Sequence, residues 1–159
     1  MPSGISNSVL AFVDFSEVTP AVANMAMKLA MALHKQLVLI HVVTPDADSE
    51  GEGFRKNVSR EGIAAELHRN HLAMSVMEAE SKGRGIKTTS LLVRGRSSRG
   101  NPTSKMLREI VRLKPDFIVM GTHGHGALHN LLLGSASAAV VRKAPCPVLL
   151  VPSKPPKQS

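Results

Sequence analysis

Aromatic residues are scarce in this chain, which has no tryptophan, no tyrosine and only four phenylalanines among 159 residues. Proteins that hold single-stranded nucleic acid stack its bases on aromatic side chains, so this scarcity argues against nucleic acid as a partner. The formal net charge is nevertheless +8. Because the basic residues are spread over several segments, we interpret the excess as a solvated basic surface.

Cysteine and long apolar runs are scarce as well. The single cysteine, Cys146, excludes an internal disulfide and fits a reducing compartment. The sequence has no run of about 18 apolar residues, and Met1–Asn7 lacks the charged start and apolar core of a secretory signal. We therefore expect a cytoplasmic protein with no membrane-spanning helix.

No composition shift, linker or internal repeat divides the chain. Its 159 residues are the usual size of one domain, and 43% of them are hydrophobic and available for a core. We expect a single domain over residues 1–152 and a disordered tail over residues 153–159.

Short apolar runs alternate along the chain with longer segments of helical periodicity. The predicted strands are Val9–Val13, Leu37–Val43, Ile86–Val93, Phe117–Met120 and Val148–Val151. The predicted helices start near Thr19, Arg55, Pro102 and Ser135 and end near His34, Lys82, Leu113 and Lys143. This alternation predicts the α/β class, with a parallel sheet and helices on both of its faces.

Apolar residues at three- and four-residue spacing predict the buried face of each longer helix. They are Val22, Met25, Leu29 and Leu33 in the first helix, Ile63, Leu67, Met74 and Met77 in the second, and Met106, Ile110 and Leu113 in the third. His41 lies within a predicted strand, and we interpret it as a packed core residue.

The segment Gly121–Gly126, GTHGHG, carries the most chemical information. It directly follows a predicted buried strand, at the edge of a parallel sheet where ligands bind. Glycines let backbone amides approach an anion closely, and the helix that starts near Ser135 adds unpaired N–H groups and a favourable dipole. The pattern favours a phosphate-bearing ligand, with Ser135 and Ser137 as further donors. The alternative is that the glycines only form turns and Ser135 only caps the helix.

Other common site patterns are missing from the sequence. There is no GxxxxGKS/T segment and no GxGxxG after the first strand, which excludes a Walker-type NTPase and the dinucleotide fingerprint. His123, His125 and His129 lie close together but have no cysteine or carboxylate nearby in sequence, so we expect no dedicated metal site.

The spacing of Gly121, Gly124, Gly134 and Ser135 resembles the ATP-binding signature of universal stress proteins. The flanking segments are similar to that family too: VDFS at Val13–Ser16, DFIVMGTHG at Asp116–Gly124, LLLGS at Leu131–Ser135 and APCPVLLVP at Ala144–Pro152. The resemblance covers about residues 6–152, nearly the whole chain.

This resemblance implies a five-stranded parallel sheet of order 3-2-1-4-5, with ATP at its carboxyl edge between the first and fourth strands. It implies that Asp14 lies near the ribose and adenine, that Val42 contacts the adenine and that Met120 flanks it. The implied ribose and phosphate contacts are Gly121, Gly124, Gly134, Ser135 and the amide of Ala136. The resemblance also implies a homodimer through the last strand, Pro147–Val151. Mg²⁺ would arrive with the ATP, because it binds largely through phosphate oxygens.

The resemblance implies a stress-response regulator whose conformation or dimerisation depends on bound ATP. One alternative is a slow ATPase or phosphotransfer enzyme, with His123 or His125 as the base and Ser135 or Ser137 as the acceptor. Another is an interaction module that binds no nucleotide, although the intact glycine signature argues against it.

The segment Arg94–Asn101 departs from the family, because it is longer than the usual link and carries Arg94, Arg96 and Arg99. We interpret it as a mobile, solvated loop. The alternative is that one of its guanidinium groups reaches the phosphates.

Overall fold

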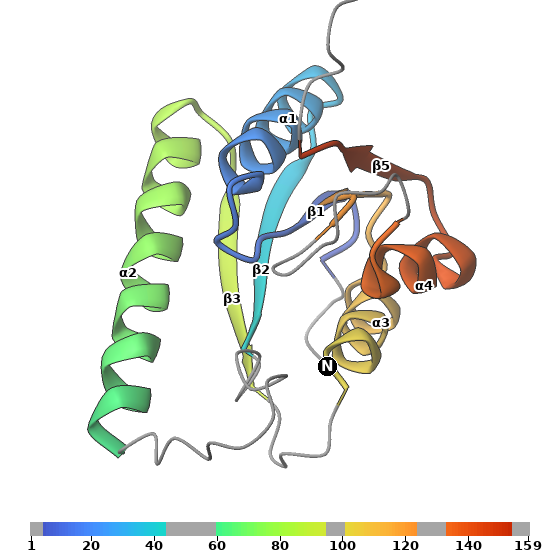
Figure 1. Ribbon diagram of the computed structural model, residues 1–159. Coiled ribbons are helices and arrows are strands. Elements are labelled where there is room, and N and C mark those ends of the chain that lie inside the picture. Colours follow the sequence, from blue (N-terminus) through green and yellow to red (C-terminus); the bar gives the residue numbers. More distant parts are fainter. Residues whose placement is uncertain (1–4, 44–59, 95–100, 124–132, 154–159) are drawn as a thin grey trace, which may run out of the picture.

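The computed structural model describes residues 5–43, 60–94, 101–123 and 133–153. Its strands are β1 (Ser8–Phe12), β2 (Gln36–Val43), β3 (Thr88–Arg94), β4 (Phe117–Gly121) and β5 (Val148–Val151). Its helices are α1 (Thr19–Ala32), α2 (Arg60–Gly83), α3 (Pro102–Leu113) and α4 (Ser135–Lys143). The strands form one parallel sheet of order β3-β2-β1-β4-β5, which confirms the predicted fold (Figure 1).

The sheet has helices on both faces, and each face has its own apolar core. Val9 and Ala11 of β1 belong to the core beneath α1 and α2, whereas Leu10 and Phe12 belong to the core beneath α3 and α4. Successive side chains of a strand point to opposite faces, so burial on both faces requires a continuous apolar run. This is why the positions of the strands could be predicted from apolar runs in the sequence.

Half of the buried residues of α1 are alanines, and the prediction from large apolar residues was partly wrong. Met25 is 37% exposed, and Leu33 is 40% exposed just beyond the last turn. The buried residues of α1 are Thr19, Val22, Ala23, Ala26, Met27 and Ala30. Small side chains let the helix backbone lie close to the sheet, so the larger residues of the neighbouring positions remain outside the contact.

The first turns of α2 extend beyond the sheet, which is why Ile63 is 43% exposed and not buried as predicted. The helix has 24 residues, or about 36 Å at 1.5 Å per residue. Its neighbour β3 has 7 residues, or about 23 Å at 3.3 Å per residue. Of the predicted face, Met74 is buried, while Leu67 and Met77 are half-buried.

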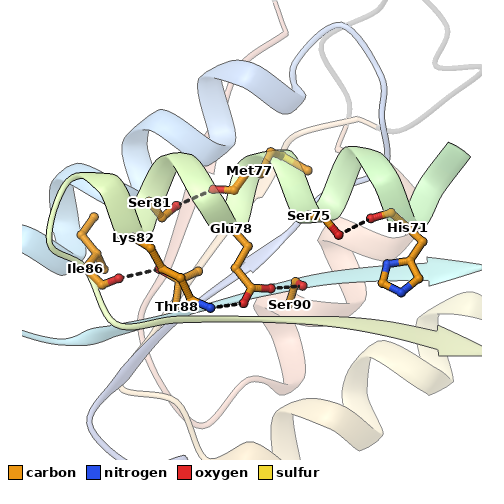
Figure 2. A network of polar contacts seen from close by, with 9 residues as sticks. All are labelled: His71, Ser75, Met77, Glu78, Ser81, Lys82, Ile86, Thr88 and Ser90. Atoms are coloured by element: carbon orange, nitrogen blue, oxygen red, sulfur yellow. Dashed lines mark hydrogen bonds and ion pairs between the residues drawn. The ribbon is translucent and has the colours of Figure 1, made fainter.

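Polar contacts join the last turns of α2 to β3 (Figure 2). Glu78 accepts one hydrogen bond from the Lys82 ammonium at 2.5 Å and another from the Ser90 hydroxyl on β3. These two hydrogen bonds, that from Lys82 first, lower the pKa of the Glu78 carboxyl below its ordinary value. Gly85, at φ +81°, then turns the chain into β3 in a conformation that favours glycine.

None of the helices in the described part of the chain is long and apolar enough to cross a membrane.

Candidate functional site

The carboxyl ends of β1 and β4 meet at the point where the connections leave the sheet in opposite directions. After β1 the chain enters α1 on one face, and after β4 it enters α4 on the other face. Such a switch point leaves a crevice outside the strand ends, which is where open α/β sheets bind ligands. The predicted site residues that the structure describes lie in the segments around this point.

Asp14 follows β1 and orders the connection to α1. Its Oδ1 atom accepts hydrogen bonds from the Ser16 amide at 2.9 Å, the Ser16 hydroxyl at 2.5 Å and the Thr19 hydroxyl at 3.2 Å. Phe15, between Asp14 and Ser16 in the sequence, has φ +60°, which is uncommon for a residue with a side chain of this size. The half-buried carboxylate therefore holds a strained loop in one shape at the edge of the sheet.

His41 supports the same loop from β2. Its Nδ1 atom lies 2.8 Å from the carbonyl oxygen of Val13, and its ring centre lies 4.5 Å from that of Phe15. Because a carbonyl oxygen only accepts hydrogen bonds, the proton of this contact resides on Nδ1. His41 is half-buried, so it is a loop support and not the packed core residue that we predicted.

Gly121, the last residue of β4, lies against the start of α1. A Cβ atom at this position would be 2.8 Å from Cγ1 of Val18 and 3.3 Å from the carbonyl oxygen of His123. Carbon atoms normally stay about 3.5–4.0 Å apart. The close approach of the β1–α1 connection to β4 thus requires glycine here, whatever ligand the site takes.

At the start of α4, a buried serine hydroxyl is already hydrogen-bonded and the N-cap residue is a glycine. Ser137 is buried and donates to the carbonyl oxygen of Gly121 at 2.8 Å, so it ties α4 to β4. Gly134 is the N-cap residue and provides no side-chain hydrogen bond, so Ser135 is not the cap. Ser135 is exposed and Ala136 half-buried in the first turn, where backbone amides lack partners within the helix.

Some of the remaining predicted residues lie in or near the apolar core, and others lie outside the described residues. Met120 is 4% exposed within the core beneath α3 and α4, and the half-buried Val42 packs against that core. His123 is half-buried, with Nδ1 2.9 Å from the Thr122 hydroxyl. Gly124 lies outside the described residues, as do residues 95–100, His125 and His129. Among the described residues no group of three or more His, Cys, Asp or Glu side chains could hold a metal.

A cavity of about 600 Å³ lies at the opposite, amino edge of the sheet, where α1 and α2 end. Two of the basic side chains that line it are paired with carboxylates. Lys35 bonds Asp116 at 2.8 Å, and Arg84 bonds Glu80 at 2.8 Å. Cations at helix C-termini also complement the helix dipole. Because these two cations are already paired, and the predicted site residues lie at the other end of the strands, we place the candidate site at the carboxyl edge.

Comparison with known proteins agrees with this architecture. The model of the universal stress protein family matches residues 6–152. The chain is 33% identical over 146 residues to a Thermus aquaticus protein named "Universal stress protein in QAH/OAS sulfhydrylase 3'region", covering 91% of this chain and 97% of that protein.

Solved structures of similar proteins share the fold. The universal stress protein UspA from Lactobacillus plantarum has a TM-score of 0.74 at 21% identity, covering 91% of this chain and 97% of that chain. A universal stress protein in complex with cAMP has a TM-score of 0.65 at 20% identity, covering 96% of this chain and 100% of that chain. One from Archaeoglobus fulgidus in complex with dAMP has a TM-score of 0.60 at 17% identity, covering 91% and 96%. The family match over residues 6–152 shows that the chain belongs to the universal stress protein family.

Proposed function

We propose that this protein binds an adenine nucleotide, ATP foremost, at the carboxyl edge between β1 and β4. The observation that carries the proposal is the start of α4, where the N-cap residue Gly134 provides no side-chain hydrogen bond. Unpaired amides and the positive end of the dipole make such a helix end suited to phosphate. Universal stress proteins with this fold have been solved with cAMP and with dAMP, which supports an adenine nucleotide as the ligand.

The proposed contacts divide the ligand among the segments at this edge. Asp14 would contact the ribose and adenine, and Val42 and Met120 would border the base. The ribose and phosphates would be held by Gly121, Gly124, Gly134, Ser135 and the Ala136 amide. Mg²⁺ would accompany ATP, held mainly by phosphate oxygens and water.

In this proposal the nucleotide regulates and is not consumed. Occupancy would change the order of the surrounding loops or the dimer state, and a partner in a cytoplasmic stress response would recognise the change. The proposed dimer forms through Pro147–Val151. This segment contains β5, which lies at the edge of the sheet and pairs only with β4 among the described strands. An edge strand carries unpaired backbone groups that can bond a second copy.

Ser135 offers a sharp test because it is exposed in the first turn of α4. Ser135→Glu places a carboxylate where we expect phosphate, and we expect ATP affinity to fall at least tenfold through repulsion between like charges. The same carboxylate is favourable for the helix dipole by about 0.3–1 kcal/mol, so the folded state should not be weakened. Ser135→Gln, of equal size and no charge, is the matched control: it loses the same serine hydroxyl, so it should bind ATP less tightly than wild type but at least tenfold more tightly than Ser135→Glu.

Calorimetric titration with ATP and Mg²⁺ measures the affinities, and chromatography of the denatured wild type identifies any nucleotide that copurifies. Sedimentation velocity on the same proteins, with and without ATP, measures the dimer. Wild type that neither releases nor binds nucleotide would overturn the proposed function. Equal affinity of the Glu and Gln variants would place the phosphates away from α4.

A further inference from the structure

Lys105, in the first turn of α3, carries a buried amino group that has no partner among the described residues. The residue is 5% exposed, and its Nζ atom has no hydrogen-bond partner among the described residues. Within the described part of the chain, no other buried side-chain nitrogen or oxygen atom lacks a hydrogen-bond partner. Lysine is almost never fully buried unless it is paired, so this residue requires a specific explanation.

The neighbouring acidic side chain is already engaged. Glu109 lies one turn further along α3 and accepts a hydrogen bond at 2.8 Å from Nε of Arg112. A charge removed from water without a partner is costly. The described fold therefore contains a cation whose counter-charge has to come from elsewhere.

The location of Lys105 points to the carboxyl edge of the sheet. α3 follows β3, so its first turn lies at the edge where the strands end. The adjacent Met106 is buried in the same core as Phe12 and Met120, the last or next-to-last residues of β1 and β4. Helical side chains tilt toward the helix N-terminus, which directs the Lys105 chain toward the edge that holds the candidate site.

Two backbone amides at the start of α3 already have partners. The Thr103 amide donates to Oδ1 of Asn101 at 2.9 Å, and the Ser104 amide donates to the Asn101 carbonyl oxygen at 3.0 Å. What this helix end offers to a ligand is the Lys105 ammonium. An ammonium is a compact charge with three donors and can bind phosphate oxygens.

We propose that Lys105 provides the counter-charge for a phosphate group of the bound nucleotide; this inference rests on the function proposed above. Two consequences follow. The site favours phosphate-bearing ligands over the uncharged nucleoside, and the nucleotide-free protein bears an unpaired buried charge that binding relieves. Lys105 thus links ligand selection to the stability of the free protein.

Lys105→Met tests both consequences, since methionine keeps an unbranched apolar chain and removes the charge. Affinities for ATP, AMP and adenosine are measured by calorimetry, and the melting temperature of the nucleotide-free protein by circular dichroism. We expect the affinities for ATP and AMP to fall tenfold or more, that for adenosine to stay within about twofold, and the melting temperature to rise. Lys28→Met, which removes an exposed lysine from α1, should change none of these values.

A second variant separates charge from shape. Lys105→Arg keeps the positive charge and should retain most of the preference for ATP over adenosine. An unchanged ATP affinity in Lys105→Met, beside a wild type that binds ATP, would overturn the role of Lys105 and leave the proposed function standing. An equal loss of ATP and adenosine would show a structural role instead. A wild type that binds none of the three ligands would overturn the proposed function together with this inference.

Discussion

A single methyl group added at Gly121 tests the contact that brings the β1–α1 connection against β4. In Gly121→Ala the new Cβ would lie 2.8 Å from Cγ1 of Val18, so the two segments must part by about 0.7 Å or more to reach a normal carbon contact. Val18 is 5% exposed, and its branched side chain has few rotamers to choose from. Gly121 is not among the positive-φ residues, so alanine adds no backbone strain.

The expected magnitude is a balance of two effects. Overpacking a closely packed site costs roughly 1–3 kcal/mol, and replacing a strand glycine by alanine returns roughly 0.5–1 kcal/mol of backbone entropy. Gly121→Ala should therefore lower the free energy of unfolding by up to about 2.5 kcal/mol. For a domain of this size, that equals a fall of up to about 10 °C in melting temperature.

A double-mutant cycle isolates the contact from other effects. Val18→Ala alone should destabilise by roughly 1–3 kcal/mol through lost packing, but it removes the atom that the new methyl group meets. The double variant Val18→Ala/Gly121→Ala should therefore be more stable than the sum of the single changes predicts, by about 1 kcal/mol or more. Urea unfolding followed by far-UV circular dichroism suits a chain without tryptophan or tyrosine. If the changes in unfolding free energy of the two single variants simply add up in the double variant, the proposed clash between Val18 and a Cβ at position 121 is refuted.

Two further predictions follow from the titrating groups. The pKa of Glu78 is lowered from its ordinary value of 4.5 in the folded state, so its contribution to stability is present above pH 4.5 and is lost as pH falls through the folded pKa. The difference in unfolding free energy between wild type and Glu78→Gln should shrink on acidification, and a constant difference from pH 6 to pH 3 would contradict the assignment. Burial, and secondarily the charge of Asp116, raise the pKa of the Cys146 thiol. Iodoacetamide at pH 8 should therefore alkylate the native protein more slowly than the urea-unfolded protein, a result that equal rates would exclude.

The elements of the fold were predictable because their signals are local. A strand buried on both faces needs an apolar run, and Leu37–Val43 provides one that matches β2 within one residue. The start of β3 was placed two residues early, at Ile86 instead of Thr88. Ile86 is 5% exposed within the preceding connection, and a buried isoleucine looks the same in sequence whether or not it belongs to a strand.

The helix faces were less predictable, because hydrophobic size is a poor guide where a helix packs closely. Ala26 and Ala30 are almost fully buried in α1 while Met31 is 49% exposed. In α3, by contrast, the predicted residues Met106, Ile110 and Leu113 are all buried. The difference is that large apolar residues of α3 alternate with charged ones, so only one face is apolar.

For the proposed site, the sequence predicts segments but not the contacts between them. The spacing of the glycines predicts a ligand edge after β4, and this stays a prediction. The contact between Gly121 and Val18 joins residues that are far apart in the sequence, as does the hydrogen bond from His41 to Val13. Lys105 carries no sequence signal at all, since a lysine in a helix is normally solvated, and its burial follows only from how α3 lies on the sheet.

The joint between β1 and β4 is also where two halves of the chain meet. β1, β2 and β3 come from residues 8–94, and β4 and β5 from residues 117–151. Three residue pairs span this joint, whereas seven pairs join β2 to β3. A nucleotide that contacts both Asp14 and the first turn of α4 would bridge β1 and β4, the strand pair with the shortest ladder in the sheet. Amide hydrogen exchange along Val9–Ala11 and Phe117–Val119 would then slow as the nucleotide binds. The rate at which β1 and β4 separate locally would therefore depend on the nucleotide concentration.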